Sequence, residues 1–147
     1  MKQSLLPRRG FLVAAAVAGL ATAVACFDEV GPINLATMMI YLPGNDTVLV
    51  DIESGAVESG PIEMFGDVDF STEFFATDGT PDSRITEVNY RLDVTPANTG
   101  LVTFTRVTQF SGSLNKLGTG TTEISFALFS LEAQEYLFDW SVPVSIN

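Results

Sequence analysis

The chain has 147 residues, of which 46% are apolar, and this combination argues against disorder and allows one hydrophobic core. It carries eighteen acidic residues against seven basic ones. All the acidic residues follow Cys26, where only four basic residues remain, so this part of the chain has a net charge of −14. Such a surface repels phosphate backbones, and we expect no nucleic-acid partner. The acidity favours cations or basic partners, and a salty habitat is a further explanation.

The first residues have the layout of an export signal. Three basic residues open the chain, and an uncharged run over 10–26 follows them. The apolar stretch 11–25 is shorter than the roughly 20 residues that a helix needs to span a bilayer. The pattern predicts a signal peptide over 1–25 that is removed, and a tilted permanent anchor is the alternative.

Two adjacent arginines precede a Gly-Phe-Leu sequence: Arg8, Arg9, Gly10, Phe11 and Leu12. This order resembles the twin-arginine export signal, and the resemblance implies export of a protein that has already folded. Pro7 and Val13 depart from the flanking residues that this signal prefers. An ordinary basic start used by the general export route is the alternative.

Small residues stand immediately before the chain's single cysteine, in the order Ala23-Val24-Ala25-Cys26. This order resembles the lipobox of bacterial and archaeal lipoproteins, which implies a lipid on Cys26 and cleavage before it. Ala23 occupies the place where lipoproteins prefer Leu, and simple cleavage after Ala25 is the alternative. Since Cys26 has no disulfide partner in the chain, lipidation is the favoured interpretation. We therefore expect a membrane-anchored lipoprotein with a short tether over 26–34.

After the tether, short runs rich in β-branched and aromatic residues alternate with turn-forming residues. We expect strands over 35–42, 47–53, 61–65, 67–76, 84–94, 101–110, 121–131 and a last strand that ends at 146. Loops are expected over 77–83 and 111–120. In 84–94, the alternation predicts that Val88, Tyr90, Leu92 and Val94 face one side.

The last strand has the clearest period of two. Its alternate residues on one side are Tyr136, Phe138, Trp140, Val142, Val144 and Ile146. Pro143 cannot donate a hydrogen bond to a neighbouring strand, so it predicts an edge strand or a bulge. We expect an all-β domain over 35–147. The prediction is a single antiparallel β-sandwich, immunoglobulin-like with Trp140 in its core, or a small antiparallel barrel.

Catalytic chemistry has few candidate residues here. The chain has no histidine and one cysteine, which excludes the Ser-His-Asp and Cys-His arrangements and the usual zinc sites. Asp67, Asp69 and Glu73 share a face of 67–76, but a solvated outer face opposite Phe70 and Phe74 explains them. We expect no enzyme and no cofactor.

Calcium is the one metal that the sequence makes conceivable. Asp78 and Asp82 lie in the loop 77–83, and Asp46 lies in the turn after 35–42. Calcium prefers carboxylate and carbonyl oxygens, but these residues are also ordinary turn formers, so they are weak candidates.

Both faces of the segment 123–131 are apolar. A central strand buried on both faces, or shielded by a loop, explains this better than an exposed patch that docks a partner. The expected function is a non-catalytic structural or protein-interaction module, anchored by Cys26 and facing the periplasm or the cell exterior. A small-ligand or calcium-binding envelope module is the alternative.

Overall fold

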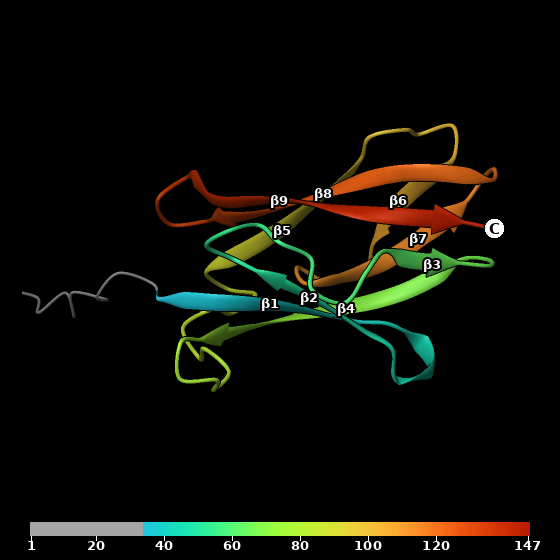
Figure 1. The fold of residues 1–147 in the computed structure, drawn as a ribbon. Coiled ribbons are helices and arrows are strands. Elements are labelled where there is room, and N and C mark those ends of the chain that lie inside the picture. The colour runs from blue at the N-terminus through green and yellow to red at the C-terminus, as the bar shows by residue number, and fades with distance from the viewer. Residues whose placement is uncertain (1–33) are drawn as a thin grey trace, which may run out of the picture. The chain divides into compact units, whose positions relative to one another are not determined.

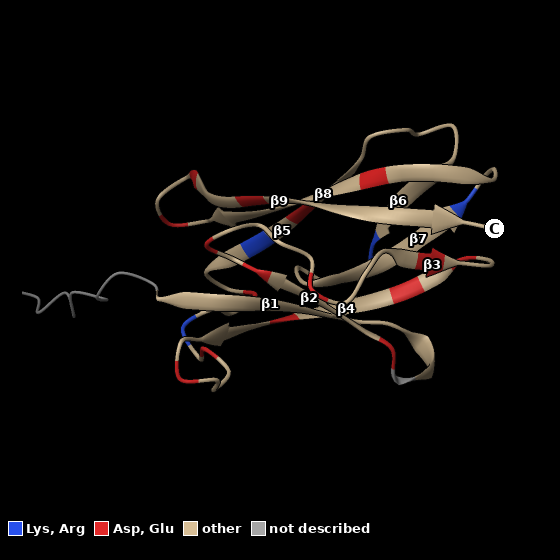
Figure 2. Ribbon diagram, viewed as in Figure 1, with Lys and Arg blue, Asp and Glu red and all other residues tan. Residues whose placement is uncertain are grey.

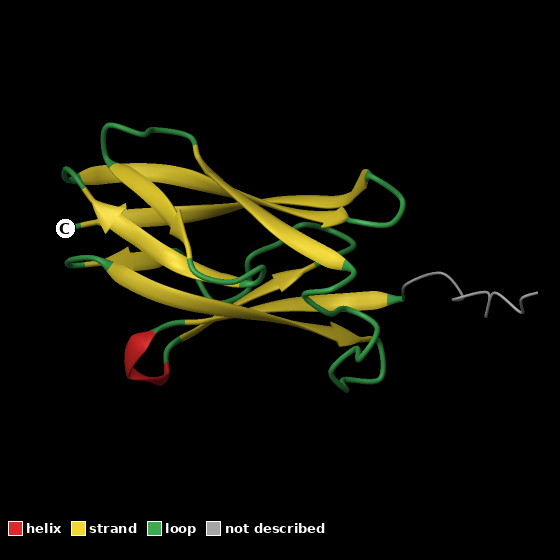
Figure 3. Cartoon of the chain, turned by 180° about the vertical axis from the view of Figure 1, so that it is seen from behind, coloured by secondary structure: helices red, strands yellow, loops and turns green. Residues whose placement is uncertain are grey.

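The computed structural model describes residues 34–147, which form nine strands and one short 3-10 turn (Figures 1 and 3). The elements in chain order are β1 (Leu35–Tyr41), η1 (Pro43–Asn45), β2 (Thr47–Asp51), β3 (Ile62–Met64), β4 (Val68–Ala76), β5 (Tyr90–Pro96), β6 (Val102–Arg106), β7 (Ser111–Lys116), β8 (Gly120–Ser130) and β9 (Glu135–Ile146). They make a five-stranded sheet in the order β2-β1-β4-β7-β6 and a four-stranded sheet in the order β3-β9-β8-β5. The expected all-β sandwich-like fold is confirmed, and of the strand pairs within residues 34–147 only β3–β9 is parallel.

The core lies between the two sheets, where alternate residues of most strands are buried, while β5 and β6 contribute Leu92 and Val102 alone. Trp140 is among them, as the sequence predicts, and its indole N–H donates to the carbonyl oxygen of Ile52 at 3.3 Å. Its ring stacks on Phe138 and also contacts Phe74 of the opposite sheet. The indole thereby buries a large apolar surface and still satisfies its one donor.

Three expectations about strands are wrong. The expected strand 101–110 ends at Arg106, so 107–110 lie outside it. The segment 84–89 is not a strand, because turn hydrogen bonds to the carbonyls of Asp82 and Thr86 hold it, and Val88 is 82% exposed. The expected loop 111–120 contains the strand β7. Its Leu114 is fully buried, and the ring of Phe104 fills the place that a side chain at Gly112 would take.

The last strand departs from its simple alternation at one point. Leu128 pairs with Phe138 but Phe129 pairs with Tyr136, so Leu137 is an extra residue in β9. This bulge turns Tyr136 to the outside, where it is 58% exposed. The expectation of an edge strand or a bulge at Pro143 is wrong, because β9 lies between β3 and β8 and its bulge is at Leu137. The inner strand tolerates the proline because the parallel partner β3 begins to pair only at Val144.

Hydrogen bonds and an ion pair join the two sheets along the side where β5 and β6 lie. The N–H of Leu92 in β5 donates to the carbonyl of Gln109, which follows β6, at 2.9 Å. Arg106 of β6 reaches across to Asp93 of β5 at 2.9 Å. Asp93 also accepts from Arg91 at 2.7 Å and from the Tyr136 hydroxyl at 2.9 Å. One carboxylate therefore links both sheets.

These contacts favour the ionised form of Asp93. Hydrogen bonds from Arg91 contribute most and lower the pKa of its carboxyl below the ordinary value, and Tyr136 and the charge of Arg106 act in the same direction. A carboxylate whose pKa is lowered by folding stabilises the fold above its unfolded pKa. That stabilisation is lost as the pH falls through the folded pKa.

We predict that Asp93→Asn lowers the free energy of unfolding by about 1 to 2 kcal/mol at neutral pH, since it removes charge-assisted hydrogen bonds. The difference in free energy of unfolding between the variant and the wild type should shrink as the pH falls below about 4. In that range the Asp93 carboxyl becomes protonated, first in the unfolded state and then in the folded state. Chemical denaturation at several pH values measures it. Glu135→Gln, at an exposed position without such contacts, is the control, and an equal loss in both variants would contradict the prediction.

We also predict that Gly112→Ala destabilises the domain by about 2 kcal/mol, because overpacking a filled site forces its neighbours to move. A Cβ at this position would lie 2.2 Å from the Phe104 ring and 2.6 Å from the Thr105 carbonyl oxygen. Gly66→Ala is the matched control, since a Cβ added at this position would have no other atom within 4 Å. Thermal unfolding of the two variants should separate them clearly, and similar melting temperatures would refute the packing at β7.

Candidate binding pocket between β2 and β3

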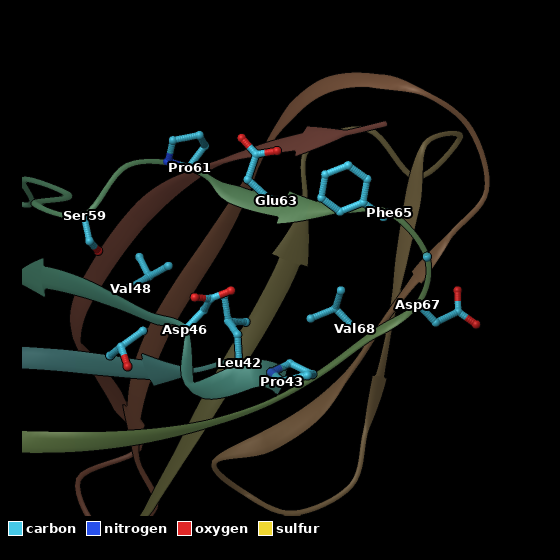
Figure 4. A pocket seen from close by; sticks show the side chains of 12 residues that line it. Leu42, Pro43, Asp46, Val48, Ser59, Pro61, Glu63, Phe65, Asp67 and Val68 are labelled. Atoms are coloured by element: carbon cyan, nitrogen blue, oxygen red, sulfur yellow. The ribbon is translucent and has the colours of Figure 1, made fainter.

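On the side of the sandwich opposite β5 and β6, a pocket lies between the two edge strands. There β2 and β3 are the outermost strands of their sheets, and they belong to different sheets. A pocket of about 500 Å³ opens between them (Figure 4). Its lining residues are Leu42, Pro43, Asp46, Thr47, Val48, Ser59, Pro61, Glu63, Phe65, Gly66, Asp67 and Val68.

Local turn chemistry places the apolar part of this lining. The N–H of Leu42 donates to the Asp46 carbonyl at 2.9 Å and closes a tight turn, in which Gly44 has a φ of +84° that favours glycine. In β3, Ile62 and Met64 point into the core, and the chain then turns at Gly66. Phe65 is left 77% exposed beside the pocket, which is unusual for so large an apolar side chain.

Carboxylates supply the polar part of the lining. Asp67 accepts from the backbone N–H of Lys116 at 2.8 Å, and Glu63 accepts from the Asn147 amide at 3.1 Å. Asp67 points away from the pocket, whereas Asp46 points into it (Figure 4). Within residues 34–147, the Asp46 carboxylate has no hydrogen bond or ion pair. Among the described residues that line the pocket there is no Lys or Arg, so its polar groups are suited to a positively charged occupant.

The three calcium candidates are not brought together. Asp46 lies beside the start of β4, whereas Asp78 and Asp82 follow the end of that strand. Asp78 accepts from the N–H and hydroxyl of Thr80 in a local turn. Asp82 is bound through both oxygens by Arg84, which lowers the pKa of its carboxyl. Among the described residues, no group of three or more acidic, cysteine or histidine side chains is placed to hold a metal ion.

The carboxylates of β4 lie on its outer face, as expected. Phe70 and Phe74 on the other face are buried. Asp69 accepts from the hydroxyl of Ser113, and Glu73 accepts from the hydroxyl of Tyr41 at 2.8 Å. Each carboxylate is thus bonded to a neighbouring strand.

The outer face of β8 is covered by side chains, not by a loop. The guanidinium carbon of Arg91 lies 4.7 Å from the centroid of the Phe129 ring. The Tyr136 and Phe129 rings pack edge to face, with their centroids 4.9 Å apart. Phe129 is therefore half-buried, while Phe126 on the inner face is fully buried. A central strand explains the two apolar faces, and the outer face offers no large open patch at Phe129.

The export and lipidation residues lie outside the described part of the chain: Arg8, Arg9, Phe11, Leu12 and Cys26. In the described part, no helix has the length and apolarity required to cross a membrane. Comparison of the chain with protein-family models, curated proteins and solved structures finds no match in any of the three.

Proposed function

We propose that this protein is an exported lipoprotein whose β-sandwich serves as a non-catalytic interaction module at the cell envelope, facing the periplasm or the cell exterior. The observation that carries the proposal is the position of Cys26. This lone cysteine ends an export-type segment and precedes the first strand, at Leu35, by only a short tether. Acyl chains on the cysteine would anchor the domain, since each buried methylene contributes about 0.8 kcal/mol.

The geometry of the domain is compatible with such an anchor. The nine residue steps from Cys26 to Leu35 reach at most about 30 Å when fully extended. The tether enters β1 at Leu35, and β1 ends at Tyr41, next to the pocket residue Leu42. The pocket thus lies beside the end of β1 that is opposite to Leu35.

Interaction with another protein fits the features that the domain exposes. An aromatic side chain that is 77% exposed, next to a pocket, is typical of a protein-binding site. Small-ligand binding is the second candidate, because a volume of about 500 Å³ falls within the range of small-molecule sites.

We predict that Cys26→Ser moves the protein from the membrane fraction to the soluble fraction, because the thiol that would carry the lipid is gone. Fractionation and intact mass measurement test this, and the wild type should show the added mass of acyl chains. Asn34→Ser, a substitution in the same tether, should remain in the membrane fraction. A Cys26→Ser protein that stays with the membrane would refute the lipid anchor.

We further predict that replacing Arg8 and Arg9 together by lysine stops export and leaves the full-length precursor inside the cell. Charge is preserved, so an ordinary basic start should tolerate this change, whereas the twin-arginine signal should not. Lys2→Arg, outside the motif, is the control and should export normally. Normal export of the double variant would assign the protein to the general route without affecting the lipid anchor.

A further inference from the structure

Two strand edges face the pocket between β2 and β3. The N–H of Asn147 donates to the Met64 carbonyl at 2.9 Å, so the backbone of Met64 points to β9. Successive residues of a strand alternate in direction, and the N–H and C=O of Glu63 therefore point away from β9, to the free edge. That edge borders the pocket.

The edge of β2 is covered along only part of its length. Leu49 donates to the Ser59 hydroxyl at 2.8 Å and accepts from the Glu58 N–H at 2.9 Å. Thr47 lies two residues earlier, so its backbone N–H and C=O point in the same direction as those of Leu49. Thr47 lies beyond the part of the edge that Glu58 and Ser59 cover, and it lines the pocket. An uncovered edge of this kind is a template for pairing with another extended chain.

The side chains beside these edges add an apolar contact and a charge. Phe65 is exposed at the mouth, with Val68 and Leu42 in the lining. Asp46 points into the pocket, without a partner in the described residues (Figure 4). The pocket therefore combines backbone groups, an aromatic side chain and a carboxylate in one place.

The charge distribution of the domain favours a positively charged occupant of the pocket. Residues 34–147 contain sixteen carboxylates and four basic side chains. Arg84 is bound to Asp82, and two more arginines are bound to Asp93. The ammonium of Lys116 donates to the Asn147 carbonyl. A basic chain is thus complementary to the pocket, and an acidic chain is repelled.

We propose that the pocket binds an extended, basic segment of a partner protein. The segment pairs with the backbone of Thr47 or Glu63, places an apolar side chain against Phe65, and brings a Lys or Arg to Asp46. Strand addition supplies affinity through the main chain, and the side chains supply selectivity. The inference deepens the proposed function as an interaction module, but it concerns the domain alone and does not require the lipid.

The test is a titration of the mature protein in neutral detergent with a peptide of alternating valine and lysine, followed by backbone amide shifts. We expect shifts at Thr47 and Glu63. Asp46→Asn and Phe65→Ala should each weaken binding by about tenfold, as at a central interface residue. Asp69→Asn and Val88→Ala, which lie elsewhere on the surface, should leave it unchanged. Binding should weaken as salt is added.

Three outcomes would overturn the inference: no shifts with the lysine peptide, equal binding of a peptide of alternating valine and glutamate, or equal binding of butylamine alone. The last would identify the occupant as a small organic cation that uses Asp46 without the strand edges. Membrane release of Cys26→Ser is measured independently of the titration. A failed anchor and a failed pocket are therefore separate results.

Discussion

The edge strands β5 and β6 are bonded to each other directly, whereas the edge strands β2 and β3 leave a pocket between them, and this asymmetry decides what the domain can bind. Asp93 holds Arg91 of its own strand and Arg106 of the opposite sheet, beside a backbone hydrogen bond from Leu92 to Gln109. Cations are scarce among residues 34–147 (Figure 2), with four against sixteen carboxylates. Two of the four meet at this carboxylate. On the other side, the Trp140 indole of β9 donates to the Ile52 carbonyl just after β2, and a pocket remains between the edges of β2 and β3.

The period-two pattern predicts the architecture well because one face of most strands is buried. Trp140 and its alternate neighbours in the last strand lie in the core as expected. The departures occur where a local pattern is overruled by contacts distant in sequence. In β7, Gly112 is required by the Phe104 ring, so a segment with the composition of a loop becomes a strand. In β9, a bulge at Leu137 reverses the outward and inward sides, which no alternation can reveal.

The pocket could not be predicted from the sequence for a related reason. Phe65 ends a run with ordinary strand composition, and its exposure follows from the turn at Gly66 and from the β3–β9 pairing. The turn-forming composition instead predicts calcium ligands at Asp46, Asp78 and Asp82. Asp78 serves local turn geometry, and Asp82 is bound by Arg84. Asp46 remains, and its setting beside an aromatic side chain and two strand edges suits an organic cation better than a metal ion.

Charge connects the proposed anchor with the proposed pocket. An acidic domain is repelled by anionic lipid headgroups, so a tether of at most about 30 Å would hold it near the membrane without drawing its surface onto the lipids. The same field attracts basic chains and raises their rate of encounter, and the effect falls with ionic strength. Exposed strand edges carry the opposite risk of pairing with unsuitable chains, and the shortness of β3, with Pro61 and Glu63, limits that risk. Because the edge is so short, backbone pairing alone gives little affinity, and selection must come from Phe65 and Asp46.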